Sequence, residues 1–415
     1  MNFVFLNQYY PPDAAPTGIM LERVVQQVVA AGHEVTVICA KGGYASQDIS
    51  DDELEKARGH YQDGVTVVRV GATSFGRRTF LGKLVDYVSF YAGVVLALSG
   101  LSCKPDRIVA MTTPPYLSVL ARIFSRIHGC SHCHWVMDLY PDVMVAHGML
   151  KPKSLLHRLL AAIARWGFGG QRCSGVISLG PDMARRLACH MDSVKTSPWV
   201  PLWSGAKATR VEPEKVMSLR KIRGWKEGDL VVMYSGNMGL GHLFDEVLEV
   251  ASVASSDNFA GSKPTRFAFF GGGKRRAEVE TFVTAHPDAP VELHDYVDSG
   301  DLDAHLASAD VHLVSLRPDW DGTMVPSKLQ GVFAAGRPVI FIGSASSSIG
   351  QWVLESGGGW LVRPGDLDAL KVAVVEASQA DECDRRGVLA HSFGMEYFDA
   401  NINAGRVANL MMNGF

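Results

Sequence analysis

The amino-acid sequence predicts an α/β protein with two doubly wound parallel sheets, one in each half of the chain. Three observations support this prediction. The 415 residues exceed the usual size of one domain. Short apolar runs alternate with helix-length segments, as in parallel sheets covered by helices on both faces. This alternation restarts near residue 230, after a stretch at 195–215 whose prolines and charges are typical of a linker.

The first half of the chain opens with a βαβ pattern. Residues 2–9 are predicted to form a buried strand, 18–32 a helix that ends at Gly32, and 34–40 the next strand. The other strands predicted for this half lie at 65–70, 107–112, 133–139 and 175–180.

The second half repeats this organisation. Its predicted strands lie at 230–236, 266–273, 291–297, 311–316, 337–343 and 359–365. "AAGHEVTV" (30–37) and "AAGRPVIF" (334–341) both place glycine at the end of a helix directly before a strand, where its freedom to adopt positive φ ends the helix. We expect two Rossmann-like domains, 1–200 and 201–390, facing a central cleft in which ligands bind at the carboxyl ends of the strands.

The composition is that of an ordinary globular protein. The hydrophobic share of 47% and the formal net charge of −3 argue against a basic nucleic-acid-binding protein. Seven cysteines at scattered spacings fit a reducing cytosol better than a disulfide framework. The N-terminal residues "MNFVFLNQYYPP" lack the features of a signal peptide. We therefore expect a cytoplasmic location.

Residues 77–101 form a stretch that could contact a membrane. Their apolar part, 84–101, follows Arg77 and Arg78 and is interrupted by Asp86, which leaves fewer than the roughly 20 apolar residues needed for a membrane crossing. Two interpretations remain open: a helix buried against the sheet, and a peripheral contact at the inner face of the plasma membrane, with basic residues facing lipid headgroups.

Glycine-rich turns follow two strands predicted for the second half. Gly236, Gly239 and Gly241 occur in "YSGNMGLGH", and Gly272 occurs in "FFGGG". Backbone N–H groups in such turns bind phosphate, although ordinary turns have the same composition. The G-x-x-G-x-G spacing read from Gly236 differs from the dinucleotide fingerprint, which argues against NAD or FAD.

Two short patterns could be taken for metal sites. Residues 130–134, "CSHCH", match C-x-x-C-H, and Asp319 and Asp321 form D-x-D. We interpret the first as small buried thiols at the start of a strand and the second as a solvated loop. No metal is expected.

The segment "VPSKLQGVFAAGRPVI" predicts a helix that begins near Pro326 and Ser327, with Lys328 one turn into it. An ammonium beside the free N–H groups of a helix start suits a diphosphate. A surface lysine near a helix start is the alternative.

Several motifs together resemble a known family. They are "N-x-Y-Y-P-P…T-G", "AAGHEVTVI", "VMDLYPD", "YSGNMGLGH", "FFGGG", "ADVHLVSL" and "VPSKLQGVFAAGRPVI". This set resembles the retaining family-4 glycosyltransferases of GT-B fold, above all the bacterial branch associated with colanic acid and O-antigen assembly, which includes fucosamine transferases. Residues 391–415 resemble the tail helix that crosses back to the N-terminal domain in this fold.

The resemblance implies transfer of a sugar, with retention of configuration and without a metal, from a nucleotide-sugar to a lipid-linked or glycan acceptor. The expected donor is a UDP-sugar bound by the C-terminal half, and the acceptor is expected on the N-terminal half. Lys328 and Arg317 would stabilise the leaving diphosphate, and Asp138 would act as a base or orient the acceptor hydroxyl. A capping or loop aspartate is the alternative for Asp138. The residues implied for donor binding are Gly18, Gly236, Asn237, Gly239, Gly241, Gly272, Tyr296, Val297, Thr323, Ser327 and Lys328.

The sequence departs from the family pattern at the donor site. Thr323 and Gly331 stand where many members carry two glutamates, and Asn237 and His242 replace an arginine and a lysine after the first strand of the second domain. A catalytically silent scaffold or regulatory partner of another transferase therefore stays open as an alternative function, and a nucleotide-sugar 2-epimerase as a third.

Overall fold

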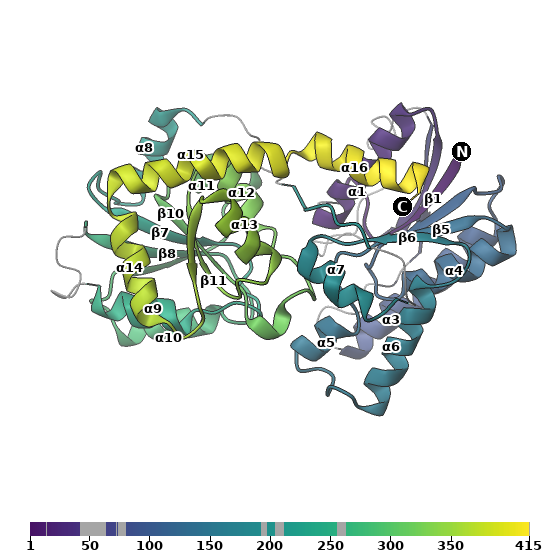
Figure 1. Cartoon of the computed structure of the whole chain (residues 1–415), viewed down its shortest axis with the longest axis horizontal. Coiled ribbons are helices and arrows are strands. Elements are labelled where there is room, and N and C mark those ends of the chain that lie inside the picture. The colour runs from purple at the N-terminus through teal and green to yellow at the C-terminus, as the bar shows by residue number, and fades with distance from the viewer. Residues whose placement is uncertain are drawn as a thin grey trace. The chain divides into compact units, whose positions relative to one another are not determined.

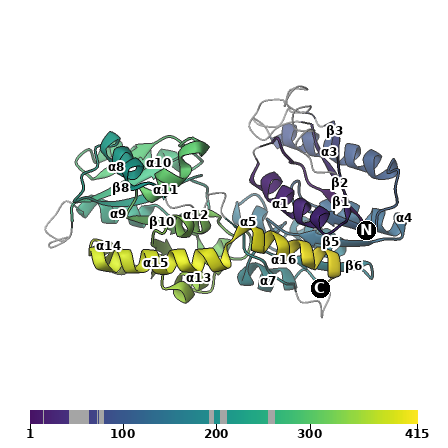
Figure 2. The same ribbon diagram turned by 90° about the horizontal axis from the view of Figure 1, so that it is seen from above.

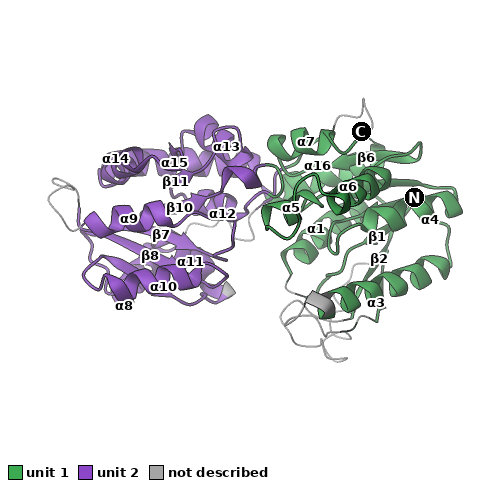
Figure 3. Cartoon of the chain, turned by 90° about the horizontal axis from the view of Figure 1, so that it is seen from below, with its two compact units in different colours: residues 1–200, 322–324, 400–415 green, residues 201–321, 325–399 purple. Residues whose placement is uncertain are grey.

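The computed structural model describes residues 1–13, 15–41, 64–71, 73, 80–191, 197–203, 211–254 and 263–414. The chain divides into two compact units, which Figure 3 shows in separate colours. Unit 1 comprises residues 1–200, 322–324 and 400–415, and unit 2 comprises residues 201–321 and 325–399. Each unit is built around its own parallel sheet of six strands.

The sheet of unit 1 has the strand order β3-β2-β1-β4-β5-β6, which is the doubly wound order. Its strands are β1 (Asn2–Leu6), β2 (Glu34–Ala40), β3 (Val65–Val70), β4 (Arg107–Ala110), β5 (Ser131–Trp135) and β6 (Cys173–Ile177). Its helices are α1 (Pro16–Ala30), α3 (Phe80–Ser99), α4 (Leu117–His128), α5 (Asp142–Ala146), α6 (Leu155–Phe168), α7 (Pro181–Ala188) and α16 (Ala400–Asn413).

The helices of unit 1 cover the sheet because each crossover buries an apolar stripe. Leu6 and Ile108 pack with Phe90 and Val94 of α3 and with Phe124 of α4 in one core cluster. The C-terminal helix α16 lies beside α1, as Figures 1 and 2 both show. The first and last helices of the chain therefore belong to the same unit.

The sheet of unit 2 has the order β12-β11-β10-β7-β8-β9, which is again doubly wound. Its strands are β7 (Leu230–Ser235), β8 (Thr265–Phe270), β9 (Val291–His294), β10 (Val311–Ser315), β11 (Val339–Ile342) and β12 (Gly359–Val362). Its helices are α8 (Pro213–Ile222), α9 (Asp245–Val253), α10 (Arg276–Ala285), α11 (Leu302–Ala307), α12 (Lys328–Ala334), α13 (Ser348–Ser356), α14 (Leu367–Ala377) and α15 (Ala380–Tyr397).

The predicted fold class is confirmed, since every predicted strand is present in the expected half. Most strands end earlier than predicted, because the residues at their carboxyl ends form turns. β8, for example, ends at Phe270, and Gly271 then takes a φ of +121°. β5 begins at Ser131 instead of residue 133, which brings His132 into the sheet.

None of the helices in the described ranges combines the length and apolarity that a membrane crossing requires. The helix α3 buries Phe90 and Val94 against the sheet but exposes Leu84, Val88 and Leu96. Arg77 and Arg78, which the predicted membrane contact included, lie outside the described residues. The peripheral contact through 77–101 stays a prediction.

Candidate functional site in unit 2

Two glycine turns lie side by side at the carboxyl edge of the unit 2 sheet. The amide of Gly236, after β7, donates to the carbonyl of Phe270 at 2.9 Å, and the amide of Met238 donates to that of Gly272 at 2.6 Å. A Cβ atom on Gly271 would lie only 2.2 Å from the Gly236 carbonyl oxygen. Gly236 and Gly271 have φ of +127° and +121°, a region that side chains disfavour. Glycine is therefore required for the two turns to pack backbone against backbone.

Lys328 lies over the first of these turns. Its Nζ is 3.0 Å from Nε2 of His242 and 3.5 Å from the carbonyl oxygen of Asn237, and its Cε lies 3.0 Å from where a Cβ of Gly236 would be. Nδ1 of His242 is 2.7 Å from the carbonyl oxygen of Ser315, so we assign the ring proton to Nδ1. Nε2 is then an acceptor for the Lys328 ammonium.

Electrostatics favour this pairing at neutral pH. Burial, and then the Lys328 ammonium, lower the pKa of His242 to about 3, which keeps the imidazole neutral. Burial lowers the pKa of Lys328 to about 8. The ammonium also lies 5.1 Å from the ring centroid of Tyr234, within range of a cation–π contact. Lys328 therefore carries a positive charge at neutral pH, but its ammonium loses a proton more readily than that of an exposed lysine.

The position of Lys328 follows from the strand order. β7 and β10 are neighbours, and the order of the strands reverses between them. Ligands of doubly wound sheets bind outside the carboxyl ends of the strands at such a switch point. His242, from the β7 turn, and Ser315, the last residue of β10, meet there.

The prediction that Lys328 lies one turn into its helix is wrong. Lys328 is the first residue of α12, and Ser327 precedes it as an N-cap whose side chain accepts no capping hydrogen bond. The helix has only seven residues. The ammonium, and not a long helix dipole, is therefore the principal positive feature contributed by this segment.

Tyr296 extends the site beyond β9. Its side chain is exposed, its hydroxyl lies 3.3 Å from the carbonyl oxygen of Gly272, and its ring lies 3.1 Å from where a Cβ of Gly272 would be. Val297 is partly buried against the cluster that contains Trp225. An exposed ring beside a glycine turn suits stacking against a flat ligand.

Other predicted donor residues have local structural roles. A Cβ on Gly241 would lie 2.8 Å from the ring of Trp320, so this glycine allows Trp320 to pack. Gly239 leaves more room, because a Cβ atom there would lie 3.4 Å from the nearest atom, which belongs to the side chain of Asn237. The guanidinium of Arg317 is paired with the Asp319 carboxylate at 3.1 Å, and both side chains are exposed. Asp319, predicted to be a solvated loop residue, thus partners the cation expected at the diphosphate.

Gly18 and Thr323 both belong to unit 1. A Cβ on Gly18 would lie 3.1 Å from the backbone of Tyr9, so glycine permits α1 to approach the loop after β1. Thr323 is fully buried, and its carbonyl oxygen accepts a hydrogen bond from the amide of Leu139 at 2.8 Å. Within unit 1 these contacts account for both residues without a ligand.

Asp138 follows β5 in unit 1. Its amide donates to Oγ1 of Thr112 at 3.1 Å, and its backbone forms a bridge with Met324. Burial raises the pKa of Asp138 to about 6. The nearest helix start, at Asp142, has Pro141 as its N-cap, so Asp138 does not cap α5.

The sequence did not reveal how His242 and Tyr234 contribute. His242 stood out only as a replacement for a basic residue, and Tyr234 looked like a core residue of β7. Their contact with Lys328 joins segments 86 or more residues apart. The hydrophobic periodicity of the sequence carries no information on such a pairing.

Comparison with protein families places two domains in this chain. Residues 17–200 match the "Glycosyl transferase 4-like domain" and residues 231–379 match the "Glycosyl transferases group 1" family. The "Probable glycosyltransferase WbjE" of Pseudomonas aeruginosa is 24% identical over 70% of this chain and 70% of its own length. The "Putative colanic acid biosynthesis glycosyl transferase WcaI" of Escherichia coli (strain K12) is 23% identical over 89% of this chain and 90% of its own length.

Solved structures share the fold. WaaG, a glycosyltransferase involved in lipopolysaccharide biosynthesis, aligns with a TM-score of 0.67 and 16% identity over 99% of this chain and 100% of WaaG. Anabaena HepE in complex with UDP-glucose aligns with a TM-score of 0.67 and 14% identity over 100% of this chain and 99% of HepE. With its two doubly wound sheets, the chain has the GT-B fold.

Proposed function

Because the chain carries a glycosyl transferase 4-like domain followed by a glycosyl transferases group 1 domain, we propose that it transfers a sugar from a UDP-sugar to a lipid-linked or glycan acceptor with retention of configuration. Its role would be in the assembly of a bacterial surface polysaccharide, as the names of WcaI and WaaG indicate for those proteins. The observation that carries the proposal is the Lys328 ammonium, held by neutral His242 over the paired glycine turns.

Unit 2 would bind the donor. Loss of the nucleoside diphosphate leaves negative charge on the phosphate oxygens, and a fixed ammonium with nearby backbone N–H groups stabilises that charge. Lys328 would supply the ammonium and the turn at Gly236 the backbone, while Tyr296 would stack on the base. This arrangement neutralises the leaving group with protein groups, which is why we expect no metal at the diphosphate. The UDP-glucose bound to HepE favours UDP as the nucleotide.

Unit 1 would bind the acceptor. Asp138 lies at the carboxyl end of β5, and its pKa of about 6 is near the pH at which the protein would work. A carboxylate of that pKa is ionised at neutral pH and can accept or orient the proton of an attacking hydroxyl. The exposed apolar residues of α3 would bring this unit to a membrane that carries a lipid-linked acceptor.

The pH dependence of turnover tests this proposal. The Asp138 carboxylate must be deprotonated, so kcat/KM for the acceptor should rise as the pH increases through about 6. Lys328 must be protonated, so kcat/KM for the donor should fall as the pH increases through about 8. The release of nucleoside diphosphate, measured from pH 5 to pH 10, would give both limbs.

Two variants show which residue is responsible for each limb of the pH profile. Asp138→Asn should abolish the acidic limb, and Lys328→Arg should move the alkaline limb beyond the measured range, because arginine keeps its charge. Retention of the alkaline limb in Lys328→Arg would show that another group controls donor binding.

A second candidate function rests on the residues that replace the two glutamates of the family. Thr323 and Gly331 are both buried and carry no charge. A ribose or sugar hydroxyl would find no carboxylate at either position. A catalytically silent partner that binds donor and supports another transferase would retain Lys328 and the glycine turns while lacking these two groups.

A further inference from the structure

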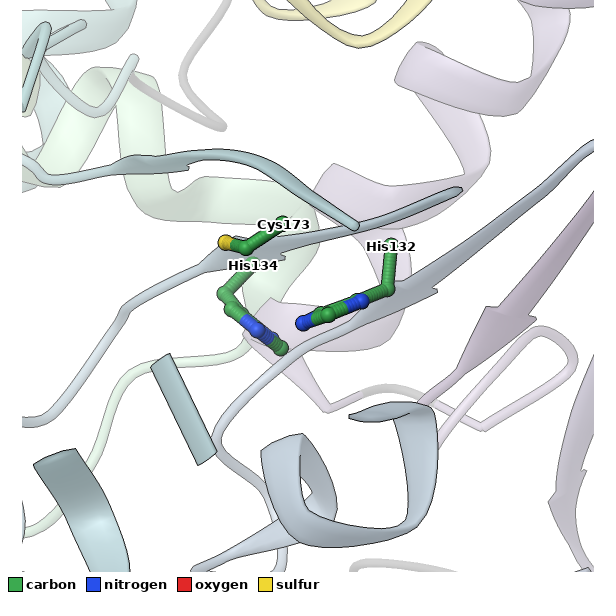
Figure 4. A group of neighbouring side chains, drawn as sticks. All are labelled: His132, His134 and Cys173. Atoms are coloured by element: carbon green, nitrogen blue, oxygen red, sulfur yellow. The ribbon is translucent and has the colours of Figure 1, made fainter. Parts of the chain in front are cut away.

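Two neighbouring strands of unit 1 place three potential metal ligands on one face of the sheet. His132 and His134 are two residues apart on β5, so their side chains point to the same side. Cys173, on β6, pairs directly with His132 in the parallel register. All three residues are buried, and their ligand atoms lie within 4.8 Å of one another. Figure 4 shows the ring of His132 directed toward that of His134.

The hydrogen bonds of the two imidazoles favour a role as ligands. Nδ1 of His132 lies 2.9 Å from Oγ of Ser125 on α4. Neither ring nitrogen of the buried His134 makes a hydrogen bond of normal geometry, although the ring interacts with the backbone of Gly167. A buried polar group without such a bond is costly unless another partner satisfies it. A metal-bound histidine typically uses its second nitrogen for a carbonyl or a hydroxyl, as these contacts would allow.

The packing above the three residues is close. A Cβ on Gly167 of α6 would lie 2.4 Å from Oγ of Ser118 on α4, so a glycine lets these two helices approach each other over the sheet. Phe168 packs edge-on against His134, with the ring centroids 5.4 Å apart. Both histidines are therefore enclosed by the protein.

We propose that His132, His134 and Cys173 bind a divalent transition-metal ion of the zinc class. Two imidazole nitrogens and a thiolate form a ligand set that zinc prefers over magnesium or calcium. Ligand atoms around a tetrahedral zinc ion are about 3.5 Å apart, so small rotations of these side chains bring the three atoms into position. The deprotonated thiol offsets one of the two positive charges.

A small cavity borders one of the three proposed ligands, His134. It has a volume of about 10 Å³ and is lined by His134 together with Thr112, Ser118, Tyr116 and Tyr140. This volume matches the space that one water molecule needs.

The site would be structural and independent of the proposed sugar transfer. β5 ends at Trp135 and the chain continues to Asp138, so a metal that joins β5 to β6 would fix the strand that precedes the proposed acceptor-binding carboxylate. The C-x-x-C-H pattern at 130–134 contributes only its histidines. Cys133 points to the opposite face of β5, and the thiolate comes instead from Cys173.

A cobalt titration of the full chain tests the proposal. Co²⁺ bound to a thiolate has a charge-transfer absorption in the near ultraviolet, which exposed histidines do not produce. The metal-free protein should develop this band at one equivalent of Co²⁺, and Zn²⁺ should abolish it. Zn²⁺ at a hundredfold excess over its Kd should also raise Tm by about 5 °C.

Matched variants locate the site. Cys173→Ser should lose the band, whereas Cys133→Ser, a buried cysteine on the other face of β5, should keep it. His134→Gln should keep the band but require at least a tenfold higher Co²⁺ concentration, which provides a test if Cys173→Ser does not fold. Absence of the band in the wild type, its persistence in a folded Cys173→Ser variant, or unchanged affinity in His134→Gln would each overturn the proposal.

Discussion

Replacement of Lys328 by alanine is expected to lower kcat at least a hundredfold and to raise KM for the donor. The ammonium lies at the switch point of the unit 2 sheet, held by His242 and the carbonyl of Asn237. Removal of a charged group that stabilises a leaving diphosphate costs on the order of 3 kcal/mol of transition-state stabilisation. Steady-state release of nucleoside diphosphate measures kcat, and calorimetric titration with UDP measures donor binding.

Lys371→Ala is the matched control for this experiment. Lys371 is a partly exposed lysine of unit 2 paired with Asp368 at 3.6 Å, and its loss should leave both kcat and UDP affinity unchanged. Wild-type turnover in Lys328→Ala would remove Lys328 from the site. Equal losses in both variants would point to a general effect of charge.

Replacement of Asp138 by asparagine is expected to lower kcat by about a hundredfold or more. The amide has the shape of the carboxylate but cannot accept a proton at neutral pH. Because we place the donor on unit 2, UDP affinity should stay at the wild-type value. The two readouts therefore separate a role at the acceptor from a general loss of structure.

Asp142 provides the control for Asp138 within the same motif. Its carboxylate accepts hydrogen bonds from Nε of Arg186 at 2.7 Å and Nε2 of His190 at 2.6 Å. Burial alone would raise the pKa of Asp142, but these two partners outweigh burial and hold it below its usual range. Asp142→Asn should therefore lower the free energy of unfolding by about 2 kcal/mol while kcat falls far less than in Asp138→Asn. A larger fall of kcat in Asp142→Asn than in Asp138→Asn would contradict the role of Asp138.

The fold could be predicted because it depends on local patterns. Buried strands of a parallel sheet appear as short apolar runs, and the connections between them are long enough for one helix each. The ends of these elements were harder to predict. Residues such as Gly236 and Gly271 continue an apolar run but adopt backbone conformations that end the strand. At the start of α12 the sequence favoured Pro326 as the first helical residue, whereas the helix begins at Lys328.

The site depends on contacts between distant segments, and here the sequence carried less information. Lys328 and the glycine turns stood out individually, but the neutral acceptor His242 is 86 residues from Lys328 and appears beside it only after β7 and β10 pair. The grouping of Cys173 with His132 depends in the same way on the register of β5 and β6. Neither the separation of His242 from Lys328 nor that of Cys173 from His132 forms a recognisable sequence motif.

The central claim is that this chain is an active glycosyltransferase. The most direct measurement is the release of nucleoside diphosphate by the purified protein from a panel of UDP- and GDP-sugars, with and without polyprenyl-diphosphate-linked saccharides. We predict acceptor-dependent release of UDP from one UDP-sugar, lost in Lys328→Ala and in Asp138→Asn. Donor binding without release for any sugar and acceptor in the panel would contradict the transferase and favour the silent partner.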